Sequence, residues 1–146
     1  MMERARTEIS SDLLRRAREM AEARGRDERE LLEELIEESL RMRRFPGIAF
    51  RDGPAGRRAR VLGTALDVWE VIEACQQMGE ERLRSESHLS ERQIDLARAY
   101  YESYPEEIES FISENRLSEE ELHGLFPAVI PPSPSARQDP PGCGSS

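Results

Sequence analysis

The stretch FPGIAFRDGPAGRRARVLGTALDVWEVI, residues 45–72, decides the fold of the central part of this chain. Two short runs of strand-forming residues, 48–50 and 59–62, flank the turn-forming sequence at 52–56, a pattern that predicts a β-hairpin. Asp67 stands at a helix N-cap position with Glu70 three residues later, the spacing of a capping box. The stretch therefore predicts a β-hairpin that leads, through a break at Gly63, directly into a helix.

Further helices are predicted on the C-terminal side of this stretch. Gly79 ends the first helix, and residues 80–86 form a short second one. Ser90 opens a third with the capping box Ser-Glu-Arg-Gln, and Pro105 suits the first turn of a fourth. Apolar residues recur along these segments at helical spacing: Val68, Val71, Ile72, Ile94, Ala97, Tyr100, Ile108, Phe111 and Ile112. A hairpin with a helical cluster is typical of a small winged or homeodomain-like helix-turn-helix domain, here residues 45–115.

Residues 1–44 predict a separate unit with the order strand, helix, turn, helix. Residues 4–9 alternate between charged and uncharged side chains, as in a strand. Ser10 can cap the first helix, and Gly25 ends it. Asp27 can cap the second helix, whose apolar stripe is Leu31, Leu32, Leu35, Ile36 and Leu40. Because so short a unit cannot bury its apolar stripes alone, we expect a homodimer.

The order of elements in residues 1–44 resembles the ribbon-helix-helix repressors. That resemblance implies that two chains pair their strands into a ribbon that enters the major groove of operator DNA. Strand alternation places Arg4, Arg6 and Glu8 on the groove side, where arginine suits guanine and a carboxylate suits cytosine. Arg26, near the start of the second helix, can meet a phosphate. The acidic start of that helix, residues 27–30, repels DNA, so a helical hairpin used only for dimerisation remains an alternative.

The central segment resembles the antitoxin family catalogued as domain of unknown function number 433. The residues that carry the likeness are the PGIAF start, the arginine-rich strand before Gly63-Thr64, the Val68-Trp69 helix, and the run LSERQIDLARAYYESYPEEIESFI. The likeness covers residues 45–113. It implies the antitoxin half of a type II toxin–antitoxin pair, with a nuclease-like toxin of PIN-type fold as the partner.

The densest basic cluster of the central segment is Arg57, Arg58 and Arg60. On the wing of a DNA-binding domain these arginines would contact phosphates, and each contact would add to the salt dependence of binding. The alternative is that they pair with the surplus carboxylates of their own domain. Both interpretations remain open from the sequence.

The last segment, residues 116–146, predicts a short helix capped by Ser118 and ended by Gly124, then a proline-rich tail that we expect to be largely disordered. Phe126, Val129 and Ile130 form an apolar, proline-flanked run beside that tail. We expect these three residues to dock into the toxin, and the alternative is that they pack on their own domain.

Composition narrows the function classes. The net charge of -9 argues against indiscriminate nucleic-acid binding, and the 21 basic residues are all arginine. Residues 1–44 carry 11 arginines against 12 acids, so they are the least acidic part and the place to expect DNA.

No run is apolar enough for a membrane span, and Cys75 and Cys143 form no metal or disulfide pattern, so we expect a cytoplasmic protein without membrane contact. His88 and His123 lack metal-ligand neighbours, and no nucleophile motif occurs, so we expect no catalytic residue, metal or cofactor.

The sequence thus predicts a mainly α-helical, two-module antitoxin with a tail. We expect it to neutralise a PIN-like toxin and to repress its own operon as a dimer. Two alternatives stay open, a transcriptional regulator without a toxin partner and a dimeric adaptor that does not bind DNA.

Overall fold

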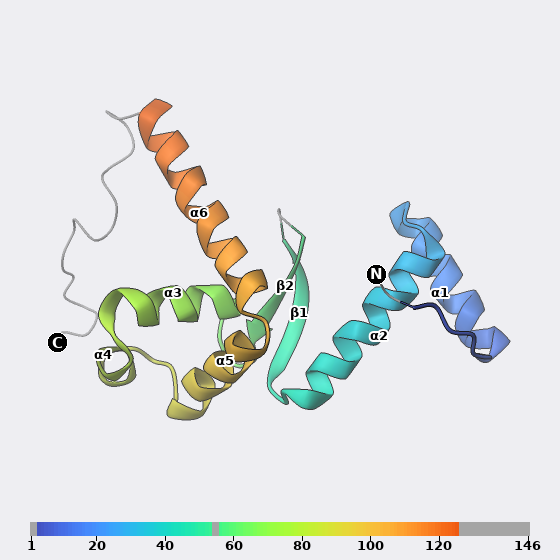
Figure 1. Cartoon of the computed structure of the whole chain (residues 1–146), viewed down its shortest axis with the longest axis horizontal. Coiled ribbons are helices and arrows are strands. Elements are labelled where there is room, and N and C mark those ends of the chain that lie inside the picture. Colours follow the sequence, from blue (N-terminus) through green and yellow to red (C-terminus); the bar gives the residue numbers. More distant parts are fainter. Residues whose placement is uncertain (1–2, 54–55, 126–146) are drawn as a thin grey trace. The chain divides into compact units, whose positions relative to one another are not determined.

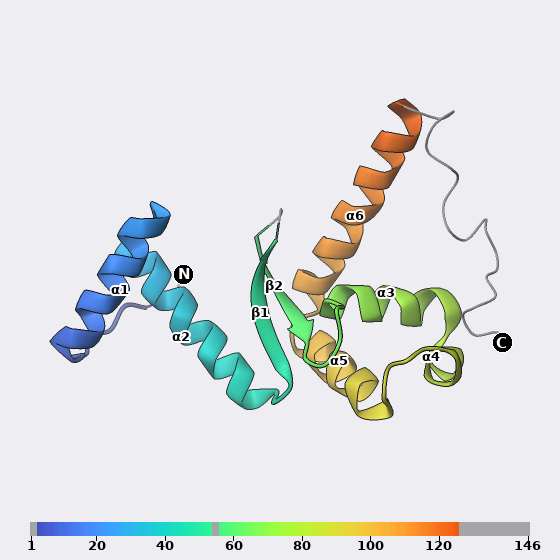
Figure 2. The same cartoon turned by 180° about the vertical axis from the view of Figure 1, so that it is seen from behind.

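The computed structural model describes residues 3–53 and 56–125, with side chains as far as Glu120. Within these residues the chain forms six helices and one two-stranded antiparallel sheet (Figures 1 and 2). The chain divides into two compact units, Met1–Arg44 and Phe45–Ser146. The mainly helical fold with a small hairpin is as the sequence predicts.

The first unit is a pair of helices, α1 (Ser11–Arg24) and α2 (Glu28–Arg44). The hydroxyl of Ser10 accepts a hydrogen bond from the Leu13 N–H at 3.2 Å and caps α1. Gly25 ends α1 in the left-handed conformation, with φ 63°, which a residue with a Cβ adopts only at a cost. Both helices begin where the capping signals predict, and α1 also ends as predicted, at Gly25.

The segment before α1 contains neither helix nor strand, and residues 3–10 are all exposed. A strand needs a partner strand to satisfy its backbone hydrogen bonds, and the described part of this single chain offers none in this unit. The predicted strand at 4–9 is therefore absent from the single chain, and it would require a second copy.

The hairpin of the second unit pairs β1 (Ile48–Gly53) with β2 (Gly56–Val61). The register sets Ile48 opposite Val61 and Phe50 opposite Ala59, and these residues face the core. The alternate residues point to the other side, so Arg51 stands directly opposite Arg58. The predicted hairpin is confirmed, but its strands run further than expected, because Asp52, Gly53 and Gly56 of the predicted turn pair within the sheet.

Four helices follow the hairpin: α3 (Val68–Met78), α4 (Glu80–Glu86), α5 (Glu91–Ser103) and α6 (Pro105–Leu125). Gly79, at φ 87°, separates α3 from α4. The Ser90 hydroxyl accepts from the Gln93 N–H at 3.1 Å, and the Gln93 side chain accepts from the Ser90 N–H at 2.9 Å. The predicted capping box of α5 is therefore confirmed.

The core of the second unit joins the hairpin to α3, α4, α5 and α6. Tyr100 is fully buried at its centre, with its ring edge-on to Phe45 at 5.5 Å and its hydroxyl donating to Glu107 at 2.8 Å. The buried members of the core are Phe45, Ile48, Ala59, Val61, Val68, Val71, Ile72, Leu83, Ile94, Ala97, Tyr100, Ile108 and Ile112. All of them lie in the second unit, which therefore has a core of its own.

One helix differs from its prediction. Residues 118–124 are helical, but they continue α6 rather than form the separate helix expected after a cap at Ser118. The preceding Asn115, Arg116 and Leu117 are already helical, so the Ser118 N–H lies within the helix and needs no cap. The proposed anchors Phe126, Val129 and Ile130, and the rest of the tail, lie outside the described residues.

Candidate functional site

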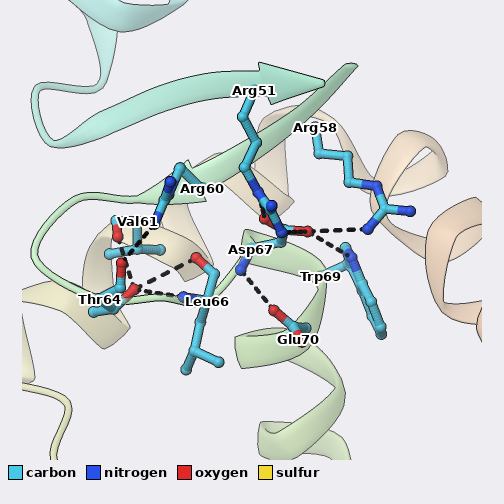
Figure 3. Close-up of polar contacts among 9 residues, drawn as sticks. All are labelled: Arg51, Arg58, Arg60, Val61, Thr64, Leu66, Asp67, Trp69 and Glu70. Carbon is cyan, nitrogen blue, oxygen red and sulfur yellow. Dashed lines mark hydrogen bonds and ion pairs between the residues drawn. The ribbon is translucent and has the colours of Figure 1, made fainter. Parts of the chain in front are cut away.

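The hairpin arginines converge on one buried carboxylate, that of Asp67. Figure 3 shows the side chains of Arg51 and Arg58 reaching from the two strands to this residue at the start of α3. Two arginines placed directly opposite each other across a hairpin repel, unless a counter-ion lies between them. Asp67 is only 1% exposed and provides that counter-ion.

The contacts around Asp67 use both of its carboxylate oxygens. Arg51 donates from Nε to Oδ1 at 2.9 Å and from Nη2 to Oδ2 at 3.2 Å, a bidentate pair. Arg58 donates from Nη1 to Oδ2 at 3.3 Å, and the Trp69 indole N–H donates to the same oxygen at 3.2 Å. A buried carboxylate is stable only with such partners.

Two further interactions hold this arrangement in place. The Glu70 carboxylate accepts a hydrogen bond from the Asp67 N–H at 2.8 Å, as in a capping box, so the helix start and the ion-pair centre coincide. The Arg58 guanidinium also lies over the ring of Phe111 in α6, 5.5 Å from its centroid. The hydrogen bond to Asp67 and its charge raise the pKa of Arg51 above the ordinary arginine value.

The three arginines expected on a DNA-binding wing thus have bonds inside their own domain. Arg58 has a side chain only 16% exposed, because it packs between Asp67 and Phe111. Arg60 donates to the Thr64 carbonyl at 3.0 Å, and Arg57 pairs with Asp52 at 3.1 Å. For Arg57 and Arg58 this geometry corresponds to the ion-pairing alternative, whereas the partner of Arg60 is a backbone carbonyl.

The predicted groove-side residues of the first unit lie in the exposed segment before α1. Arg6 and Glu8 are exposed, and Arg6 has no ion-pair partner in the described part of the chain. Arg4 pairs with Glu33 of α2, and Arg26 pairs with Glu34 at 2.8 Å. The first unit therefore brings two candidate arginines onto neighbouring carboxylates and leaves a third open to solvent.

Exposed apolar side chains are concentrated in the first unit. Its buried apolar residues are Ala17, Ala21 and Leu31, whereas its large exposed ones are Ile9, Leu13, Met20, Leu35, Ile36, Leu40 and Met42. In the described part of the second unit, the large exposed apolar residues are Leu62 and Leu117. The first unit thus leaves most of its apolar surface uncovered, and the second unit leaves little.

The motifs that resemble the antitoxin family lie in the hairpin, α3, α5 and α6. No family model, curated protein or solved structure matches the chain. The functional assignment therefore rests on those motifs and on the geometry of the two units.

Two open hollows lie on the helices of the second unit. One, of about 330 Å³, has Ile72, Cys75 and Tyr101 among its lining residues, and the other, of about 340 Å³, lies beside the 63–66 turn. Burial raises the pKa of the Cys75 thiol, which keeps it protonated and unreactive. A hydrogen bond to Glu109 raises the pKa of the Tyr101 hydroxyl in the same hollow.

The described residues also bear on a membrane span and on a metal site. No helix there combines the length and the apolar character that a membrane crossing requires. No three His, Cys, Asp or Glu side chains of that part of the chain come together in a way that could hold a metal ion.

Sequence reasoning missed three residues of these networks, Arg51, Glu33 and Glu34, and it missed the ion-pairing role of Asp67. The predicted turn at 52–56 would have set Arg51 opposite Arg57, and only the longer strands, which pair Gly53 with Gly56, set it opposite Arg58 and create a like-charge pair in need of a carboxylate. No comparable local signal marks Glu33 and Glu34, since their partners are reached only after the chain has folded.

Proposed function

We propose that this protein is the antitoxin of a type II toxin–antitoxin pair. Two copies associate through residues 1–44, and the paired N-terminal segments present Arg4, Arg6 and Glu8 to operator DNA as in ribbon-helix-helix repressors. The second unit and the tail bind and neutralise a PIN-like toxin. The protein acts in the cytoplasm and by binding, without a metal, a cofactor or catalysis.

The uncovered apolar surface of the first unit is the observation that carries the proposal. A unit whose buried apolar residues are two alanines and a leucine cannot offset the entropy of ordering about forty residues. A second copy would cover Leu35, Ile36 and Leu40 and would give residues 4–9 the partner strand that they lack. The need to cover this surface thus supports dimerisation and the ribbon, and operator binding is proposed to use that ribbon.

The second unit supports a protein-binding role rather than a DNA-binding one. Its hairpin arginines are used around Asp67 and Thr64, and acids outnumber arginines on it by 14 to 8 within residues 45–115. Such a surface repels phosphates and suits a basic protein partner. This agrees with the role implied by the likeness to the antitoxin family.

Co-expression with the product of the adjacent reading frame tests the antitoxin assignment. The wild-type chain is expected to restore growth that the partner alone arrests, and to co-purify with it. Substitution of alanine at Phe126, Val129 and Ile130 should abolish both effects, whereas the tail control S133A with S135A should preserve them. Absence of a complex and of growth rescue with the wild-type chain would refute the assignment.

Operator binding is tested separately, with DNA from upstream of the chain's own reading frame at a fixed salt concentration. Arg4→Ala with Arg6→Ala is expected to weaken binding at least about tenfold, because base contacts by arginine contribute roughly 1–3 kcal/mol each. Arg15→Ala with Arg16→Ala changes the charge equally but removes arginines that pair with Asp12, and it serves as the control.

A dimeric adaptor that does not bind DNA is the second candidate function. The observation in its favour is that Arg4 and Arg26 are held by carboxylates of α2 in the single chain. Absence of DNA binding by the wild type and by both arginine variants, with toxin neutralisation intact, would establish the adaptor instead.

A further inference from the structure

Two adjacent carboxylates of α2 hold two of the candidate operator arginines. Arg4 donates from Nη1 to Glu33, and Arg26 donates from Nη1 to Oε1 of Glu34 at 2.8 Å. Arg4 precedes α1 and Arg26 precedes α2, so the two come from different parts of the unit. Both arginines are therefore paired with carboxylates at consecutive positions of α2.

These ion pairs compete with DNA in a direct way. A guanidinium that is already paired with a carboxylate attracts a phosphate less, because the pair carries no net charge. A phosphate that approaches Arg26 also meets Glu34, whose side chain is 24% exposed. Arg6, which has no ion-pair partner among the described residues, is not restrained in this way.

We propose that Glu33 and Glu34 restrain operator binding by occupying Arg4 and Arg26. The inference rests on the operator binding proposed above and adds a regulatory property to it. DNA must displace both carboxylates before it gains the two arginine contacts, so the wild-type affinity is set below what the arginines alone would give.

The experiment compares two double variants of the full chain with equal changes of charge. Glu33→Gln with Glu34→Gln removes the two carboxylates that hold the arginines. Glu22→Gln with Glu30→Gln removes two exposed carboxylates of the same unit that form no side-chain ion pair in the described structure. Both are measured against operator DNA over a range of salt concentrations, against a heparin column, and by circular dichroism to check helix content.

The variant at positions 33 and 34 is expected to bind operator DNA roughly threefold to tenfold more tightly than the wild type, since exposed ion pairs of this kind are weak. Its affinity should also fall more steeply with salt, because each new phosphate contact releases counter-ions. The variant at positions 22 and 30 should gain less than about twofold, with an unchanged salt slope.

Equal gains in the two double variants would overturn the inference, because a general change of charge would then explain the effect. Weaker binding by the variant at positions 33 and 34 would also overturn it and would show that the carboxylates position the arginines for DNA. If neither the wild type nor any variant binds the operator, operator binding itself fails. The inference about the operator is then overturned with it, and later heparin elution of the variant at positions 33 and 34 alone would show only that the two carboxylates shield the arginines from polyanions.

Discussion

At the scale of single residues, Asp67 organises more of the second unit than any other polar side chain described. It lies at the first turn of α3, yet its partners come from both strands of the hairpin (Figure 3). Because this buried carboxylate binds an arginine from each strand, it fixes the orientation of the hairpin relative to α3. Loss of its charge would leave Arg58 packed against Phe111 without a counter-ion.

Asp67→Asn is therefore expected to lower the free energy of unfolding by about 3 kcal/mol, in the range found when one partner of a buried ion pair is removed. Urea unfolding followed by the fluorescence of Trp69, the single tryptophan, measures this change. Asp52→Asn is the control, because Asp52 is 74% exposed in its pair with Arg57 and should contribute less than about 1 kcal/mol. Equal losses in the two variants would contradict the central role of Asp67.

At the scale of elements, short capping signals decide where the helices begin. The Ser90 hydroxyl and the Gln93 side chain satisfy each other's backbone N–H groups at the start of α5. Because α5 supplies Ile94, Ala97 and Tyr100 to the core, its first turn also supports the packing of the domain.

Ser90→Ala is expected to destabilise the domain by about 1 kcal/mol, the usual contribution of a serine N-cap. Thermal unfolding measured by circular dichroism tests this expectation. Ser85→Ala, at an exposed position within α4, removes a hydroxyl that bonds only to its own helix and should change stability by less than about 0.5 kcal/mol. A negligible effect of Ser90→Ala would mean that packing alone fixes the start of α5.

The elements that follow from local signals were predictable from the sequence. Ser10, Gly25 and Ser90 mark helix boundaries because each acts on backbone groups within a few residues. Two features were not predictable in this way. The continuity of α6 through Ser118 depends on a helix that is already formed, and the Asp67 centre depends on contacts between the hairpin and α3.

The candidate site shows the same difference between what local sequence signals predict and what depends on packing. The arginine positions could be found from the sequence, but their partners could not. Arg58 and Asp67 are nine residues apart, and Arg4 and Glu33 are 29 apart. Such pairs form only when elements pack, so a basic cluster in the sequence did not distinguish a DNA contact from an internal ion pair.

At the scale of the whole molecule, the two units differ in how far each can stabilise itself. The second has a core of thirteen buried residues, whereas the first buries three apolar residues. Stability of the first unit is therefore expected to depend on the concentration of the protein, as in dimers that fold on association.

Ile36→Gln with Leu40→Gln is expected to weaken dimerisation at least about a hundredfold. Both side chains are more than half exposed in the single chain, and burial of such a side chain contributes about 1.5–3 kcal/mol. Light scattering on the full chain over a concentration series measures the change. Leu62→Gln with Leu117→Gln removes equally exposed leucines from the second unit and should leave the dimer intact. A wild-type protein that stays monomeric at all concentrations would refute the dimer.

The uninterrupted course of α6 has a geometric consequence. Among the residues of α6 whose side chains are described, Ile112 is the last buried one, and residues 116–120 beyond it are exposed. One residue inserted into a helix advances the end by about 1.5 Å and turns it by roughly 100°. A single alanine inserted after Leu117 would therefore rotate the face presented at Glu120 by more than a quarter turn, while Ile108 and Ile112 keep their places in the core.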